Sequence, residues 1–166
     1  PAQKVCDEIK AAGGKAVPNG DSVADPAGAE RMIKTAVETF GKIDGVVCPA
    51  GILRERMLFN MSEDEWDPVI ATHLKGTFTV FRAAAARMKE QKSGSLIGFT
   101  SGAFAGSVAQ ANYAAAKGGI VSLVRSAAAG MYRYGVPSNC IAPVAQTRLS
   151  AQVPMELQMG DAEDVA

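Results

Sequence analysis

Tyr113 and Lys117 are the residues whose types and spacing point most directly to chemistry. They are four positions apart, about one helical turn, so both side chains would lie on the same face of a helix. A lysine ammonium beside a phenol favours the phenolate, and it would lower the tyrosine pKa from about 10 toward the range of a useful acid or base. The alternative is a surface helix whose tyrosine packs and whose lysine is solvated.

Ser101 is a third candidate residue, because the elements predicted around it could place its hydroxyl group near this pair. Residues 96–100 form a short apolar run that predicts a strand, and Ser101 follows its end. A loop rich in Gly, Ala and Ser then leads to residues 110–112, which open the helix that carries Tyr113. This arrangement can bring the Ser101 hydroxyl beside the Tyr113 phenol.

Helices and short strands alternate along the chain. Helical spacing of apolar residues predicts helices over 1–14, 26–40, 66–92 and 113–134, and short runs predict strands over 15–17, 43–48, 96–100 and 138–142. Asp25 is an N-cap before Pro26, Gly41 ends that helix, and Ser62 with Glu65 matches a capping box. The run 43–48 is almost wholly apolar, as in a parallel strand covered on both faces. The alternation predicts an α/β fold with a doubly wound parallel sheet.

In these features the chain resembles the short-chain dehydrogenase/reductase family. The landmarks fall in the family order over nearly all 166 residues, and they are residues 44–51, 71–78, Ser101, the Tyr113/Lys117 pair, and 141–143 with Thr147. Within the family, residues 52–57 and 60–62 look most like the 3-oxoacyl-ACP reductase, 3-hydroxyacyl-CoA dehydrogenase and hydroxysteroid dehydrogenase branches. The resemblance implies a Rossmann-type fold and an NAD(P)-dependent oxidoreductase that acts on a ketone or secondary alcohol.

The resemblance also implies catalytic roles for four residues. Negative charge builds on oxygen during hydride transfer to a carbonyl, so a proton donor and a second hydrogen bond must converge there. Tyr113 would be the general acid in reduction and the base in alcohol oxidation, Ser101 would hold the substrate oxygen, and Lys117 would bind the nicotinamide ribose. His73 stands where family members often carry a proton-relaying asparagine. An imidazole can relay a proton, and a packed structural histidine is the alternative.

Cofactor contacts are implied for NAD or NADP, again by resemblance. The family's Asn-Asn-Ala-Gly turn reads Cys48-Pro49-Ala50-Gly51 here, and Pro49 has no N–H to donate. Val144 follows Pro143 where the family favours glycine. The cofactor-binding residues implied are Asp21 or else Ser22 beside the adenine, Ala50, Gly51, Tyr113, Lys117, Pro143, and Thr147 at the carboxamide.

This sequence has no glycine-rich turn, between a first strand and a first helix, of the kind that binds a pyrophosphate. Aligned by elements, residues 1–166 form a single partial Rossmann-type domain that lacks the first two strands and the last strand of the family. In the family sheet, that loss would leave a gap of about 14 Å between two strands, at ~4.8 Å per strand. We therefore expect a fragment, or the ordered part of a longer chain.

Composition excludes several other classes of protein. The chain has 17 Lys and Arg against 17 Asp and Glu, so it has no excess of positive charge that would favour binding to nucleic acid or an anionic membrane. Its apolar runs are far shorter than the ~20 residues that span a bilayer, and it opens without a signal peptide. Three scattered cysteines suit buried thiols in a reducing compartment, so we expect a cytoplasmic location. With one histidine, they offer no close pair of ligands, so no metal site is expected.

Two other functions compete with the oxidoreductase. The altered turn at residues 48–51 and the Pro143-Val144 step would suit a noncatalytic relative kept for assembly or ligand binding, whereas retention of Ser101, Tyr113 and Lys117 together favours the enzyme. A serine hydrolase lacks support, because the chain has no G-x-S-x-G elbow. The expected partners are a small carbonyl or alcohol substrate and further copies of the chain. Family members commonly pair the helices over 66–90 and 113–134, which predicts a homodimer or homotetramer.

Overall fold

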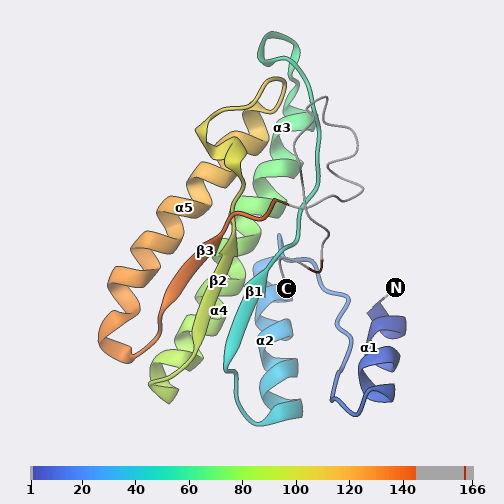
Figure 1. The fold of residues 1–166 in the computed structure, drawn as a ribbon, viewed down its shortest axis with the longest axis vertical. Helices are drawn as coiled ribbons and strands as arrows, with labels where there is room; N and C mark the ends of the chain where they lie inside the picture. Colours follow the sequence, from blue (N-terminus) through green and yellow to red (C-terminus); the bar gives the residue numbers. More distant parts are fainter. Residues whose placement is uncertain (1, 145–162, 164–166) are drawn as a thin grey trace.

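Three parallel strands organise this computed structural model, which describes residues 2–144 and 163 (Figure 1). They are β1 (Gly45–Cys48), β2 (Ser95–Phe99) and β3 (Ser138–Ile141), and they lie side by side in chain order. Val46 pairs with Leu96, and Leu96 pairs with Ser138. Helices connect each strand to the next, so the Rossmann-type α/β fold with a parallel sheet is confirmed.

The predicted helices are formed, and local capping explains where α2 and α3 begin. They are α1 (Ala2–Ala11), α2 (Pro26–Phe40), α3 (Glu63–Ile70), α4 (Gly76–Gln91) and α5 (Ala111–Met131). The Asp25 carboxylate accepts hydrogen bonds from the Ala27 and Gly28 N–H groups at 3.1 and 3.0 Å. Gly41 ends α2 in the left-handed region, with φ at 84°. Ser62 and Glu65 form the expected capping box at α3.

The helix predicted over 66–92 is continuous but not uniform. A π-helical turn at Ala71–Lys75 separates α3 from α4. Turns of this kind are rare and often occur at functional sites, and this one carries His73. Short 3₁₀ turns at Leu58–Asn60, Gly102–Ala105 and Tyr132–Tyr134 complete the regular structure.

Two expectations about the strands were wrong. Residues 15–17 form no strand, because a strand needs a hydrogen-bonded neighbour and the sheet in the described residues begins at β1. The run at 43–48 is covered on one face only. Val46 is 7% exposed, whereas its neighbour Val47 is 55% exposed. The core formed by Val46 includes residues from α2, α4 and α5, so these helices pack on the same side of the sheet.

Close packing between α5 and β2 sets the position of the candidate site. A Cβ atom on Gly98 of β2 would lie 2.8 Å from Val124 Cγ2 and 3.1 Å from Ile120 Cγ2, both on α5. Glycine therefore lets the helix approach the strand closely. Beyond Gly98, the Thr100 hydroxyl donates a 3.0 Å hydrogen bond to the Lys117 carbonyl oxygen. These contacts hold the first half of α5 against the carboxyl end of β2.

We predict that Leu96→Ala lowers the free energy of unfolding by about 2–5 kcal/mol, because the Leu96 side chain is fully buried between the sheet and its helices. Leu58→Ala is the matched control, since Leu58 is 71% exposed and its loss should change stability by less than about 0.5 kcal/mol. Urea unfolding followed by circular dichroism measures both values. Equal effects of the two substitutions would contradict this assignment of the core.

Candidate active site

Tyr113 and Lys117 lie together on α5, as their spacing predicts. The Lys117 Nζ atom is 5.3 Å from the centre of the Tyr113 ring, over its face. Lys117 is 5% exposed, and its ammonium donates a 2.7 Å hydrogen bond to the carbonyl oxygen of Phe99, the last residue of β2. The lysine is therefore buried at the end of the strand, and it is not a solvated surface group.

Ser101 lies two residues after the end of β2. Its hydroxyl oxygen accepts a 3.3 Å hydrogen bond from the Ala103 N–H and begins the turn Gly102–Ala105. Burial raises the pKa of the Tyr113 phenol above its usual value, and the interaction with the Ser101 side chain opposes that rise. Ser101 and Tyr113 are thus brought together as expected.

Lys117 does not lower the Tyr113 pKa in the way that the sequence analysis expected. The pKa of the phenol is shifted upward, since burial dominates. The ammonium lies over the ring face and donates its hydrogen bond to the Phe99 carbonyl oxygen. Burial also lowers the pKa of Lys117 to about 8, because the low-dielectric surroundings disfavour its charged form.

His73 completes the cluster from the π-helical turn. It is 4% exposed, and its ring packs edge-on against the Tyr113 ring, with 5.1 Å between centroids and an interplanar angle of 86°. Its Nε2 atom is 3.0 Å from the Ile52 nitrogen and 2.8 Å from the Ile52 oxygen. Its Nδ1 atom is buried without a hydrogen-bond partner among the described residues. Burial lowers the His73 pKa, so the ring is neutral near pH 7.

Gly51 passes directly against the His73 ring. A Cβ atom at Gly51 would clash with His73 Cε1, closer than real Cβ atoms approach a neighbour. Glycine is therefore required if the ring is to keep this position. Ala50 and Gly51 follow β1, and the half-buried Pro143 follows β3, so these implied cofactor residues lie past the carboxyl ends of their strands. Ligands of open α/β sheets bind at this edge.

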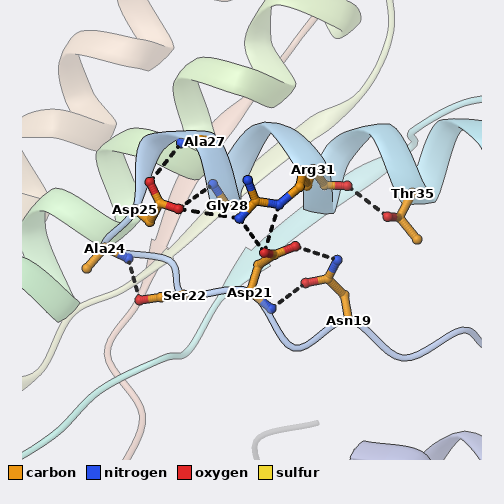
Figure 2. Close-up of polar contacts among 9 residues, drawn as sticks. All are labelled: Asn19, Asp21, Ser22, Ala24, Asp25, Ala27, Gly28, Arg31 and Thr35. Atoms are coloured by element: carbon orange, nitrogen blue, oxygen red, sulfur yellow. Dashed lines mark hydrogen bonds and ion pairs between the residues drawn. The ribbon is translucent and has the colours of Figure 1, made fainter.

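Asp21 and Ser22 lie in the loop before α2 (Figure 2). The Asp21 carboxylate accepts hydrogen bonds from Arg31 and from the Asn19 side chain, and the contact with Arg31 lowers its pKa. The Ser22 hydroxyl oxygen accepts a 3.3 Å hydrogen bond from the Ala24 N–H. The next residue, Val23, lines a small cavity with Cys48 and Ala50, so this loop reaches the end of β1. Thr147 lies outside the described residues.

The described residues contain no group of His, Cys, Asp and Glu side chains that could hold a metal ion. Within the same residues, every helix is too short or too polar to cross a bilayer. The candidate site contains one phenol, one hydroxyl, one imidazole and one amine at the carboxyl edge of the sheet.

A family model described as short chain dehydrogenase matches residues 1–156. The chain belongs to this family of oxidoreductases. It is 46% identical over 165 residues to the hydroxyacyl-CoA dehydrogenase ChsB1 of Mycobacterium tuberculosis, covering 92% of this chain and 52% of that protein. It is 41% identical over 143 residues to the 3-oxoacyl-(acyl-carrier-protein) reductase FabG of Staphylococcus aureus, covering 86% and 58% of the two chains.

A crystal structure of a short chain dehydrogenase from Mycobacterium avium resembles the fold, with a TM-score of 0.84 and 52% sequence identity. The match covers 89% of this chain and 54% of that one. The chain thus spans about half the length of the relatives that it matches. The family resemblance inferred from the Tyr113/Lys117 pair and its neighbouring landmarks is confirmed.

Sequence reasoning missed one polar residue next to this cluster. Asn112 is fully buried, and its side-chain amide donates hydrogen bonds to the carbonyl oxygens of Arg54 and Glu65. Its position before Tyr113 is the one hint that the sequence offers. A buried asparagine cannot be recognised from its type, because asparagine is mostly exposed in proteins.

We predict that the Lys117 amine titrates with a midpoint near pH 8, against about 10.4 for an ordinary lysine. The positive charge at the site is then present below this pH and lost above it. NMR of protein containing lysine labelled with carbon-13 at Cε measures the midpoint, and Lys117→Met identifies the resonance by removing it. A midpoint near 10 for that resonance would show that the amine is solvated.

Proposed function

We propose that the protein is an NAD(P)-dependent oxidoreductase that transfers a hydride between a nicotinamide cofactor and a ketone or secondary alcohol. The convergence of Tyr113, Ser101, Lys117 and His73 at the carboxyl edge of β2 carries the proposal. Relatives named as a hydroxyacyl-CoA dehydrogenase and a 3-oxoacyl reductase support a 3-oxoacyl or 3-hydroxyacyl thioester as the substrate. A steroid is the second substrate class to test.

Tyr113 would donate the proton to the substrate oxygen during reduction. Its raised pKa keeps the phenol protonated at neutral pH, which suits a donor. The Ser101 hydroxyl would donate the second hydrogen bond to the same oxygen, where negative charge develops. In alcohol oxidation, the same phenol must first lose its proton, so this direction is favoured as pH rises.

Several residues fit the nicotinamide end of a cofactor. An ammonium has three N–H donors, and that of Lys117 donates one hydrogen bond among the described residues, so it can bind ribose hydroxyl groups. Ala50, Gly51, Tyr113 and Pro143 would border the cofactor, with Asp21 or Ser22 toward its adenine and Thr147 toward its carboxamide. Bound there, the nicotinamide would supply or accept the hydride.

His73 would move protons at Nδ1, a buried atom that has no hydrogen-bond partner within residues 2–144. Burial lowers the ring's pKa, so the neutral imidazole has one nitrogen able to accept a proton and one able to donate. Its packing against Tyr113 places it beside the residue whose proton must be exchanged in each turnover.

A cytoplasmic location stays a prediction from the sequence.

We predict that Tyr113→Phe lowers kcat by at least about 10²-fold, because the phenol supplies the transferred proton. The loss of NAD(P)H absorbance with a panel of ketones and 3-oxoacyl thioesters measures turnover of the full-length protein, and fluorescence titration measures cofactor binding. Retained binding with lost turnover is the expected result. Unchanged turnover would remove Tyr113 from the reaction, and binding without turnover by either protein would favour a noncatalytic ligand-binding subunit.

We also propose that a second copy of the chain covers the outer face of α4 and α5. A groove of about 240 Å³ lies between these helices, lined mostly by apolar residues that include Phe78, Leu123 and Met131. Phe78 is 47% exposed beside it, although it is large and apolar. Exposed apolar surface on adjacent helices is typical of an interface. A homodimer or homotetramer built through these helices would cover it.

We predict that Phe78→Asp converts the oligomer to monomer at micromolar concentration, because a charge would be buried in the interface. Phe59→Asp is the matched control, since Phe59 is 79% exposed on the loop before α3. Light scattering measures the mass of each variant. A wild-type protein that is monomeric at this concentration would contradict the proposed pairing.

A further inference from the structure

The loop of residues 52–57, called the strap here, is bonded to His73 and to the residues that precede Tyr113. At one end, the Ile52 peptide groups contact His73 Nε2. At the other end, the Arg56 N–H donates a 2.8 Å hydrogen bond to the Ala109 carbonyl oxygen, just before α5 begins. The Gln110 side chain also donates to the carboxylate of Glu55. The strap therefore connects the π-helical turn to the start of α5.

Asn112 joins the strap to both neighbouring helices. Its Nδ2 atom donates to the Arg54 carbonyl oxygen at 2.9 Å and to the Glu65 carbonyl oxygen, in α3, at 2.7 Å. Its Oδ1 atom accepts a 2.7 Å hydrogen bond from the Tyr113 N–H. Both donors of the amide are used, in a place with no exposed surface. The side chain thus fixes three segments relative to one another at the residue before the phenol.

We propose that Asn112, assisted by Gln110, is a positioning residue that keeps the Tyr113 phenol beside Ser101. Tyr113 follows Asn112 directly, so a shift of the start of α5 away from the strap moves the phenol relative to β2. Such a shift weakens the Ser101 interaction that restrains the Tyr113 pKa. The inference rests on the proposed function, since it assigns Asn112 to the geometry of that reaction.

Asn112→Asp tests this role with little change in shape. The carboxylate keeps an oxygen that accepts from the Tyr113 N–H, but it loses both donors and sets an oxygen against two carbonyl oxygens. We expect kcat to fall on the order of 10²-fold, the loss that a misplacement of about 1 Å can cause, with little change in the KM of the cofactor. The pH profile of alcohol oxidation should move upward, because the phenol pKa rises when the Ser101 interaction weakens.

Arg56→Ala is the control. It removes the 2.8 Å ion pair between Arg56 and Glu65 but leaves the bonds of Asn112 and the Arg56 backbone in place. Because this pair is half-exposed on the arginine side, kcat should stay within about five-fold of wild type. A similar pH shift in both variants would show that general loosening of the strap, and not Asn112, causes the effect.

Hydrogen–deuterium exchange gives a readout that does not depend on activity. In Asn112→Asp, the amides of the strap should exchange faster, above all the Arg56 N–H that is bonded to Ala109. Wild-type exchange, kcat and pH profile in a folded Asn112→Asp variant would overturn the inference. If the wild-type protein itself shows no turnover, the proposed function fails, and unchanged exchange would still refute the anchoring role separately.

Gln110→Met keeps the inference testable if Asn112→Asp does not fold. Methionine fills a similar volume but cannot donate to Glu55, so one of the bonds between the strap and the start of α5 is lost. The same upward shift of the pH profile and faster exchange of the strap are expected, with a smaller fall in kcat. Wild-type behaviour in both measurements would overturn the inference.

Discussion

The junction between α5 and the end of β2 determines the geometry of the candidate site. Lys117 is bonded there twice, because its ammonium donates to the Phe99 carbonyl oxygen and its own carbonyl oxygen accepts from the Thr100 hydroxyl. Gly98 permits the close approach that these bonds need. Tyr113 lies one turn earlier on the same helix, so its position follows from the junction. The phenol reaches Ser101 because helix and strand are joined at this point.

Burial at this junction also controls the charges of the site. It lowers the pKa of Lys117 to about 8, raises that of Tyr113 and lowers that of His73, so each shift favours the neutral form. As pH rises, the ammonium of Lys117 loses its proton before the phenol of Tyr113 does. Few molecules therefore carry the Lys117 charge and the Tyr113 charge at the same time. A protonated phenol at neutral pH suits the proton-donor role proposed for Tyr113.

Local signals made much of this structure predictable, and long-range contacts account for what the sequence could not reveal. The Asp25 cap and the Ser62/Glu65 box act within a few residues, and both are formed as predicted. The spacing of Tyr113 and Lys117 likewise needs one helical turn. The strand expected at 15–17 depended on a distant pairing partner, and the sign of the Tyr113 pKa shift depended on how deeply the phenol is buried. The anchoring bonds of Asn112 reach residues 47 and 58 positions away.

His73 and Gly51 show how an imidazole ring fits between the π-helical turn and the residues that follow β1. The ring fits because residue 51 has no Cβ atom, and its Nε2 atom lies near both the N–H and the carbonyl oxygen of Ile52. In one tautomer Nε2 accepts from that N–H, and in the other it donates to that oxygen. The ring therefore has a backbone partner at Nε2 in either neutral tautomer. These contacts satisfy the buried Nε2 atom, as a packed histidine also requires, so the proton-relaying role of His73 rests on the proposed function.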